Sequence, residues 1–405
     1  MLALHATLTG HSARVWHVCW HPTLPLLATC GEDRTVRVWS PTPSAALPPP
    51  PPEPAAPAAP APLSSTWQCI HTLEDFATRT VRACEWSPCG RFLAACSFDS
   101  NTTVWRVGGG ALAAGAQAGV LARGGCAPAE LTFDVLAVLD GHENEVKGVA
   151  WSASGELLAT CGRDKSVWLW EAVDEGADFE CIAVLHGHEG DVKALAWHPT
   201  RDVLASASYD DSLRLWGEGG EDWCAVQALP SAHGSTVWAC AWEGGNGSSA
   251  TRRLASVGED GALRVWAAAE AGGAGGVAEA VALSAAGAAP AAHAPRSAFS
   301  VHWAAEGVAW GAGSGAGSGA DGAGAGSEAL LATCGADDAL RVWSVPAGGS
   351  EAPVQRACVG GAHGGLDVNS VRWHRALPVL ATGGDDYAVR VWRWEGGAGE
   401  ARAAS

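Results

Sequence analysis

Residues 141–170 read GHENEVKGVAWSASGELLATCGRDKSVWLW, and residues 187–216 repeat the same pattern. Each copy closes on a Trp after a short alternating run of the kind typical of half-buried β-strands. Each copy also carries a His, a hydroxyl residue, an Asp and a Trp at matching spacings: His142, Thr160, Asp164 and Trp170 in the first, and His188, Ser206, Asp210 and Trp216 in the second. The chain is therefore built from copies of one β-structured unit.

The closing Trp of this unit occurs seven times along the chain. The seven residues are Trp39, Trp105, Trp170, Trp216, Trp266, Trp343 and Trp392. An Asp stands six residues before each of them: Asp33, Asp99, Asp164, Asp210, Asp260, Asp337 and Asp386. A second Trp ends an earlier strand-like segment of every unit, at Trp20, Trp86, Trp151, Trp197, Trp242, Trp303 and Trp373. Fourteen of the 21 Trp residues thus mark the repeat.

Six units carry both a His before the second Trp and a Ser or Thr four residues before the Asp, whereas unit two carries neither and has Ala95 in place of the hydroxyl. A buried His without its hydroxyl partner would cost about 1–3 kcal/mol. Joint loss is therefore what a hydrogen-bonded set predicts. We interpret His142, Thr160, Asp164 and Trp170, like the corresponding set in the next unit, as a structural tetrad.

This pattern resembles the WD-repeat family, in which each unit forms one four-stranded propeller blade. The resemblance implies an all-β protein that folds as one seven-bladed β-propeller over residues 1–395. It places the His in the loop before the first strand, the Ser or Thr on the second strand, the Asp in the next turn and the closing Trp on the third strand. We expect Leu2–Leu8 to supply the outer strand of the last blade, which would close the ring.

Uneven spacing of the closing Trp residues indicates insertions between or within the blades. Their composition identifies them, because segments rich in Pro, Ala, Gly and Ser bury too little apolar surface to offset the entropy of ordering. We predict mobile insertions at residues 41–65, 108–130, 267–292 and 311–327, and a C-terminal tail at residues 396–405.

The composition narrows the function classes. The 405 residues contain 48% apolar residues, enough for a large core, and carry a formal net charge of −18. This field would repel nucleic acid and anionic membranes, so we predict neither as a partner. No stretch is apolar enough to be read as a membrane span or a signal peptide. Thirteen scattered Cys residues without a CxxC motif favour reduced thiols, and therefore a cytoplasmic or nuclear protein.

Catalytic chemistry is not indicated. A Ser–His–Asp nucleophile requires one activated copy, whereas the repeated set occurs six times, each time with a Trp. The match to G-x-G-x-x-G at residues 317–322 lies in a low-complexity stretch without the strand and helix that a phosphate loop needs. No His or Cys cluster has metal-ligand spacing. We therefore predict no enzyme activity, no cofactor and no metal site.

Two positions of each unit point to a binding face at one end of the ring: the residue before each framework Asp, and the residue four before each second Trp. Core positions would be uniformly apolar, but these are charged or aromatic and differ between units. Units two to four supply cations on a strongly acidic chain, which favours recognition of a carboxylate-bearing peptide. The candidate binding residues are Arg163, Lys147, Arg82, Lys193, Tyr209, Phe98 and Trp238.

The alternative is that these cations pair locally with Glu145, Asp191 or Asp211 on the same rim. We expect Arg163 to be the central residue of the candidate site, because Lys147 and Lys193 flank it and the cations outnumber the acids available for local pairing. The two interpretations differ in whether positive charge is left over for a guest.

Several strings go beyond the general repeat. Residues 141–151, 163–170 and 204–211, with RTVR at 79–82 and STVW at 235–238, are similar to the WD-repeat subunit of the cytosolic iron-sulfur protein assembly machinery. The resemblance implies a non-enzymatic adaptor of the targeting complex. Such an adaptor joins other subunits of that complex and delivers clusters to client apoproteins. A WD-repeat substrate receptor or a histone-binding scaffold is the alternative, and an acidic ring would favour it.

Overall fold

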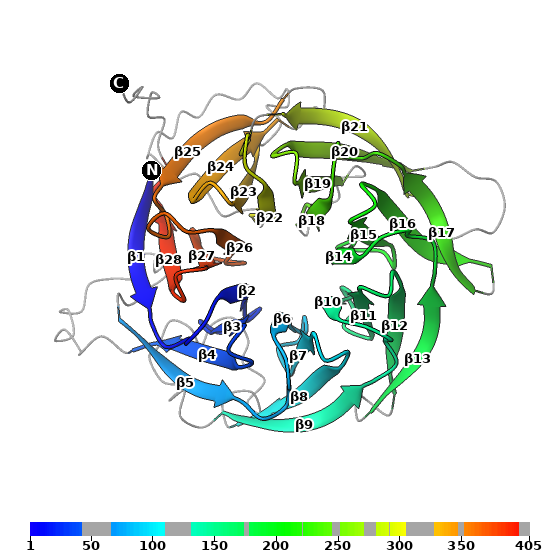
Figure 1. The fold of residues 1–405 in the computed structure, drawn as a ribbon, viewed down its shortest axis with the longest axis horizontal. Coiled ribbons are helices and arrows are strands. Elements are labelled where there is room, and N and C mark those ends of the chain that lie inside the picture. Colours follow the sequence, from blue (N-terminus) through cyan, green and yellow to red (C-terminus); the bar gives the residue numbers. More distant parts are fainter. Residues whose placement is uncertain are drawn as a thin grey trace, which may run out of the picture.

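The computed structural model describes residues 1–42, 66–109, 131–173, 178–220, 222–244, 252–270, 281–290, 292–304, 328–346 and 352–396. These residues form seven four-stranded antiparallel sheets and no helix. The sheets stand side by side as the blades of a closed ring (Figure 1). The predicted all-β, seven-bladed β-propeller is confirmed.

Each blade is a meander that runs from an inner strand at the centre of the ring to an outer strand at the rim (Figure 1). The strands, blade by blade, are β2 (Val15–Trp20), β3 (Leu27–Gly31), β4 (Val36–Pro41) and β5 (Trp67–Leu73); β6 (Val81–Trp86), β7 (Phe92–Ser97), β8 (Thr102–Gly108) and β9 (Thr132–Leu139); β10 (Val146–Trp151), β11 (Leu157–Gly162), β12 (Val167–Val173) and β13 (Asp178–Leu185); β14 (Val192–Trp197), β15 (Leu204–Ser208), β16 (Leu213–Gly219) and β17 (Asp222–Leu229); β18 (Val237–Trp242), β19 (Arg253–Gly258), β20 (Leu263–Glu270) and β21 (Val281–Ala289); β22 (Ala298–Trp303), β23 (Ala329–Gly335), β24 (Ala339–Val345) and β25 (Val354–Gly360); and β26 (Val368–Trp373), β27 (Val379–Gly384), β28 (Val389–Trp394) and β1 (Leu2–Leu8).

Blade seven is completed by the first strand of the chain. β1 pairs antiparallel with β28, in a register that sets Leu2 opposite Trp394 and Leu8 opposite Val389. The backbone N–H of Glu395 also donates to the carbonyl of Met1 at 2.9 Å. The predicted closure by Leu2–Leu8 is confirmed, and it covers an edge strand that would otherwise be open to pairing.

The hydrophobic core lies between neighbouring blades. In one cluster Phe92 and Ala94 of blade two pack with Trp151, Leu158 and Trp170 of blade three, and clusters of this kind follow around the ring. Leu158 is fully buried, and burying a Leu contributes about 1.5–3 kcal/mol relative to exposure. Each blade therefore depends on both neighbours for stability.

The second Trp series hydrogen-bonds neighbouring blades together. Five of the seven indole N–H groups donate to the backbone carbonyl just before the equivalent Trp of the preceding blade: Trp20 to Arg372, Trp151 to Glu85, Trp197 to Ala150, Trp242 to Ala196 and Trp303 to Ala241, at 2.9–3.2 Å. The N–H groups of Trp86 and Trp373 are buried without a partner among the described residues. The seams before blades two and seven therefore lack one inter-blade bond each.

The predicted tetrads are present. In blade three the Trp170 indole donates to the Thr160 hydroxyl at 2.9 Å, this hydroxyl lies 2.9 Å from Nε2 of His142, and Nδ1 of His142 lies 2.6 Å from Asp164. The set for the next blade has the same geometry. In a relay from indole through hydroxyl and imidazole to carboxylate every donor has an acceptor.

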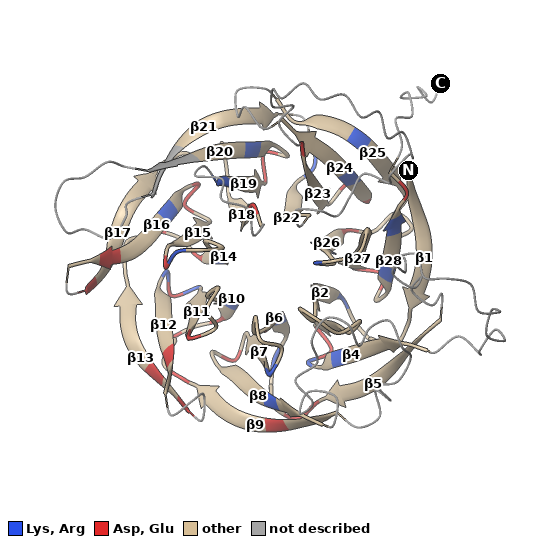
Figure 2. Cartoon of the chain, turned by 180° about the vertical axis from the view of Figure 1, so that it is seen from behind, with Lys and Arg blue, Asp and Glu red and all other residues tan. Residues whose placement is uncertain are grey.

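The framework Asp also accepts a hydrogen bond from a second side chain, and the type of this side chain differs between two groups of blades. In blades one, three and four a hydroxyl two residues later donates to the Asp: Thr35, Ser166 and Ser212, at 2.5–2.9 Å. In blades five to seven an Arg four residues later pairs with it: Arg264, Arg341 and Arg390. Blue bands on β20, β24 and β28 mark these strands in Figure 2. This difference between the two groups of blades was not predicted from the sequence.

Blade two replaces the tetrad. Ala95 has no hydroxyl, and the ring of Phe76 packs edge-to-face on Trp105 with centroids 4.6 Å apart. Asp99 is retained and accepts from the backbone N–H of Thr78 at 2.7 Å and from its hydroxyl at 3.3 Å. An apolar contact and one hydroxyl residue therefore take the place of the His and its partner.

One predicted insertion contains regular structure. Residues 281–289, within the stretch 267–292 predicted as a mobile insertion, form β21 and complete blade five, and β20 extends to Glu270. Backbone hydrogen bonds hold an outer strand, so a composition of Ala, Gly and Ser suffices there. The prediction for 311–327 lies outside the described residues. So do most of 41–65 and 108–130 and residues 397–405 of the tail. No helix long and apolar enough to cross a membrane is present in the described ranges.

Candidate functional site

The candidate residues lie on the inner strands of blades two to five and on the loops beside them. Lys147 and Lys193 are the second residues of inner strands β10 and β14, and Trp238 has the same position on β18. Arg163 and Tyr209 follow the second strands of blades three and four and are 55% and 60% exposed. We call Arg79, Arg82, Lys147, Arg163 and Lys193, with Phe98, Tyr209 and Trp238, the basic sector.

Glu145 is the first centre of the basic sector. Its carboxylate lies 2.7 Å from Arg79, 3.6 Å from Arg163 and 3.9 Å from Lys147. Burial alone would raise the pKa of Glu145, but the hydrogen bond from Arg79 and the charges of the three cations lower it below its usual value. Arg79 was not among the candidates drawn from the sequence, because it precedes the strand whose positions defined the binding face.

Asp191 is the second centre. Its carboxylate lies 2.5 Å from Nζ of Lys147 and 3.4 Å from Nζ of Lys193, so Lys147 bridges the two acids. Burial lowers the pKa of Lys193 to about 8, and the charge of Lys147 adds to this effect against the opposing influence of Asp191. A lysine with this pKa loses charge within the mildly alkaline range.

Aromatic rings surround the two lysines. Nζ of Lys193 lies 5.2 Å from the ring of Tyr209 and 5.0 Å from that of Trp238, and Nζ of Lys147 lies 6.0 Å from Phe98. These distances suit cation–π attraction. The indole N–H of Trp238 is buried without a partner among the described residues. An apolar group of a guest would therefore find an exposed ring, that of Tyr209, beside the cations.

Arg82 lies apart from the two acids. Its guanidinium lies 5.0 Å from the ring of Trp16 in blade one, and burial lowers its pKa. Ion pairs and ring contacts join all of the other candidates to one another among the described residues, but they do not join Arg82 to them. Arg82 therefore extends the cationic surface toward blade one without sharing its carboxylates.

Local pairing accounts for part of the positive charge. Arg79, Arg163 and the two lysines share the two carboxylates of Glu145 and Asp191, which leaves an excess of two positive charges even without Arg82. Asp211, the third acid considered, forms no ion pair with these cations among the described contacts. The competing interpretations from the sequence thus each describe part of the arrangement.

The opposite part of the same face is acidic. Arg14 lies 3.7 Å from Glu32 and 3.4 Å from Asp385, and Asn369 donates to Asp385 at 2.8 Å. Burial raises the pKa of Asp367, and the charge of Asp385 raises it further. This part of the face therefore gathers three carboxylates around Arg14, in contrast to the excess of cations in the basic sector.

A buried polar cluster at the inner strands was not predicted from the repeat pattern. Nδ1 of His17 lies 2.9 Å from the carbonyl oxygen of Cys84, and its Nε2 accepts from Arg372 at 2.8 Å. Burial raises the pKa of the nearby Glu85 to about 7. No group of three metal-ligating side chains occurs in the part of the chain that the structure describes.

A family model now provides an independent comparison. The model for the WD domain, G-beta repeat, matches residues 3–40, 67–106, 133–171, 179–217, 225–267 and 356–393. The chain belongs to the WD-repeat family. The matched ranges leave out β22 to β24, so the structure adds a blade that the family model does not delineate.

Curated relatives refine this assignment. A probable cytosolic Fe-S cluster assembly factor of Schizosaccharomyces japonicus is 45% identical over 266 residues, 65% of this chain and 35% of that protein. A probable cytosolic iron-sulfur protein assembly protein 1 of Mycosarcoma maydis is 39% identical over 182 residues, 42% of this chain and 38% of that protein. The chain thus spans little more than a third of these two relatives.

A third relative is matched over more of its length. The probable cytosolic iron-sulfur protein assembly protein 1 of Vanderwaltozyma polyspora is 42% identical over 267 residues, 65% of this chain and 70% of that protein. Coverage of more than two thirds places the chain in the same family as this relative. The resemblance to the WD-repeat subunit of cytosolic iron-sulfur assembly is confirmed.

Proposed function

We propose that this propeller is a non-enzymatic adaptor of cytosolic iron-sulfur protein assembly, which binds other subunits of the targeting complex and client apoproteins. Membership in the family supports the pathway. The repeated tetrads support a non-enzymatic role, because their His, hydroxyl and Asp side chains hydrogen-bond to one another inside the blades. The names of its relatives describe a cytosolic process, and the protein acts in the same compartment.

The basic sector is the client site in this proposal. The observation that carries it is the surplus of cations over carboxylates around Glu145 and Asp191, beside exposed Tyr209. A carboxylate-bearing segment of a client pairs with Arg163, whose guanidinium is half exposed and bound only at 3.6 Å to Glu145. An apolar side chain of the same segment packs against Tyr209 or Trp238.

The test is co-purification of iron-sulfur assembly components and apoproteins from cytosol with the parent protein, with Arg163→Glu and with Arg393→Glu. Arg393 is an exposed Arg of β28, far around the ring, and is the matched control. We expect Arg163→Glu to lose client capture at least tenfold with an unchanged melting temperature, and Arg393→Glu to retain it. High salt is expected to release clients from the parent.

The pH dependence of client binding is a second test of the same site. Because the pKa of Lys193 is about 8, client affinity is expected to fall as the pH rises from 7 to 9. Recovery of histones or a ubiquitin-ligase scaffold in place of iron-sulfur components would reject the proposed pathway. Capture that survives Arg163→Glu would reject the proposed site.

A further inference from the structure

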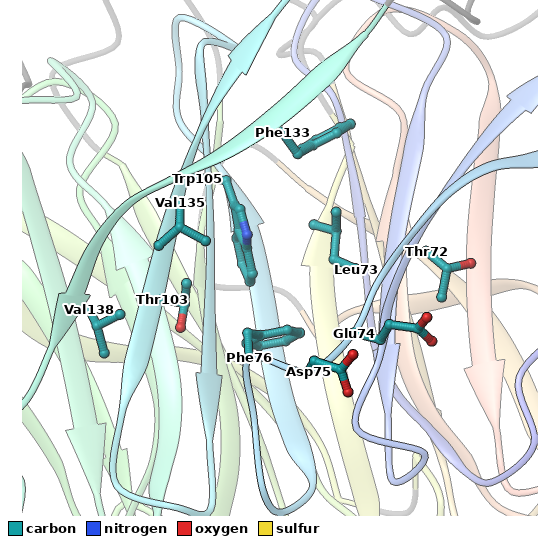
Figure 3. A pocket seen from close by; sticks show the side chains of 10 residues that line it. All are labelled: Thr72, Leu73, Glu74, Asp75, Phe76, Thr103, Trp105, Phe133, Val135 and Val138. Carbon is teal, nitrogen blue, oxygen red and sulfur yellow. The ribbon is translucent and has the colours of Figure 1, made fainter.

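A pocket of about 420 Å³ lies at the outer rim of blade two, and none of its lining residues belongs to the basic sector. The end of β5 and the following loop form one wall, β9 forms the other, and Phe76 and Trp105 lie between them (Figure 3). Its lining residues are Thr72, Leu73, Glu74, Asp75, Phe76, Thr103, Trp105, Phe133, Val135 and Val138. No function proposed above uses this region.

The pocket lies at the blade that lost its tetrad. Where the other blades place a His preceded by Gly or Ala, this blade has Phe76 and Ala77, and Phe76 turns its ring against Trp105. Asp75, just before it, has a φ of 65°, a left-handed conformation that few residues other than Gly adopt. The loop therefore holds Phe76 inward and leaves the carboxylates of Glu74 and Asp75 at the margin of the pocket (Figure 3).

The opposite wall exposes apolar surface. Val135 and Val138 of β9 are 59% and 54% exposed, although both flank the pocket. Blade three continues this surface with Ile182 and Val184 on its outer strand β13, which lies next to β9 in the ring (Figure 1). Apolar side chains gathered in this way at a concave site mark a contact surface more often than scattered ones do.

The charge at this rim is opposite to that of the basic sector in the same blades. Glu74 and Asp75 are exposed and form no ion pair among the described contacts. Acidic residues also mark the outer strands β9, β13 and β17 in Figure 2. An acidic client segment that suits Arg163 would be repelled here, so the occupant has different chemistry.

We propose that the blade-two pocket binds an extended segment of a partner protein in which an apolar side chain stands next to a Lys or Arg. The apolar side chain enters between Phe76 and Val138, and the cation pairs with Glu74 or Asp75. This surface is separate from the client site, so one propeller holds two partners of opposite charge at once.

The probes are fluorescein-labelled nonapeptides of sequence SGSKXKSGS, with X as Leu, Phe, Trp or Ala, and the same set with Glu in place of Lys. Fluorescence anisotropy measures binding to the full chain. We expect the Lys peptides with an apolar X to bind at least tenfold more tightly than the Ala peptide and the Glu set. Equal binding of all peptides, or of none, overturns the proposal.

Charge reversal of the pocket is the decisive variant. Glu74→Lys with Asp75→Lys is expected to invert the preference, so that the Glu peptides bind more tightly than the Lys peptides. Both residues are exposed, so the variant keeps the fold, and its thermal unfolding is compared with that of the parent. An unchanged preference in a folded variant overturns the proposal.

A matched pair of substitutions locates the apolar contact. Val138→Glu is expected to weaken the Lys peptides at least tenfold, while Val354→Glu, at a 47% exposed Val on outer strand β25 of blade six, leaves them unchanged. Arg163→Glu is expected to leave this binding intact, which separates the pocket from the client site. Equal losses for the two Val variants would show that the pocket does not hold the peptide.

Discussion

Blade two and blade three have the same four strands but hold their loops in different ways. In blade three, His142, Thr160 and Trp170 form a buried relay that ends on Asp164. In blade two, Phe76 packs on Trp105, and the framework Asp99 accepts from Thr78 and from the backbone N–H of Asn101 without any His. The comparison teaches that the tetrad is not required for a blade to form, because packing against both neighbours already specifies it.

The two blades differ more in what they expose. The relay of blade three closes its loop over buried polar groups, whereas the apolar replacement in blade two leaves a pocket beside Phe76 and two exposed Val residues. The blade without the hydrogen-bond network is therefore the one with a pocket and exposed apolar side chains that a partner could contact. The following changes either remove this difference between the blades or measure it.

The largest effect is expected from Thr160→Val in blade three. This nearly isosteric change leaves both the Trp170 indole and Nε2 of His142 buried without a partner, at about 1–3 kcal/mol each. We expect the free energy of unfolding to fall by roughly 2–5 kcal/mol in equilibrium urea denaturation. At the equivalent position of blade two, Ala95→Ser breaks no hydrogen bond and is expected to be less destabilising than Thr160→Val. Similar losses in both blades would refute the relay.

An intermediate effect, with a defined pH dependence, is expected from Asp33→Asn in blade one, which has a full tetrad. Burial alone would raise the pKa of Asp33, but hydrogen bonds from His11 and Thr35 lower it to about 2, from 3.8 in the unfolded chain. The carboxylate therefore contributes about 2 kcal/mol above pH 4, and this contribution is lost as the pH falls toward 2.

Denaturation of the parent and of Asp33→Asn at pH 7, 5 and 3 checks this prediction. The difference between the two proteins is expected to be full at pH 7 and 5 and to narrow at pH 3. Asp99→Asn in blade two, where no His donates, is the control and is expected to cost less at pH 7. A difference for Asp33→Asn that stays constant with pH would contradict the assigned cause.

The smallest effect is expected at the seams. Trp151→Phe removes a hydrogen bond of 3.2 Å to the carbonyl of Glu85, whereas Trp86→Phe removes a buried N–H that has no partner. Both changes remove the same volume, so their difference isolates the hydrogen bond. Trp151→Phe is expected to be more destabilising by about 1 kcal/mol, measured as the urea midpoint at constant slope. The opposite order would mean that the inter-blade bonds contribute nothing.

Most of the fold was predictable because the repeat samples the same structure seven times. Seven copies of an Asp six residues before a Trp fix the number of blades, and the joint absence of the His and the hydroxyl in unit two identified the tetrad as a set. β21 was missed because the backbone ladder of an outer strand needs few large side chains, so Val281–Ala289 has the composition of a linker. The bond from Trp151 to Glu85 was missed because its acceptor is a backbone atom of another blade.

The candidate site was predictable in its location but not in its pairing. Equivalent positions of each unit brought Lys147, Arg163 and Lys193 to one face, as expected. That Glu145 binds three cations, one of them Arg79, depends on side-chain directions across two blades, which spacing along the chain does not encode. The sequence indicated that blade two is exceptional, because Phe76 and Ala77 stand where the other blades have a His preceded by Gly or Ala. It did not predict a pocket there.

Closure by β1 also ties folding to the order of synthesis. β1 (Leu2–Leu8) precedes every other described strand of the ring in the sequence, and it pairs with β28 (Val389–Trp394), which follows all of them. Until β28 is made, β1 has an unpaired backbone edge. Blade seven cannot form before then, because it combines β1 with β26, β27 and β28. During synthesis, the edge of β1 therefore stays open to unwanted pairing until β28 has been made.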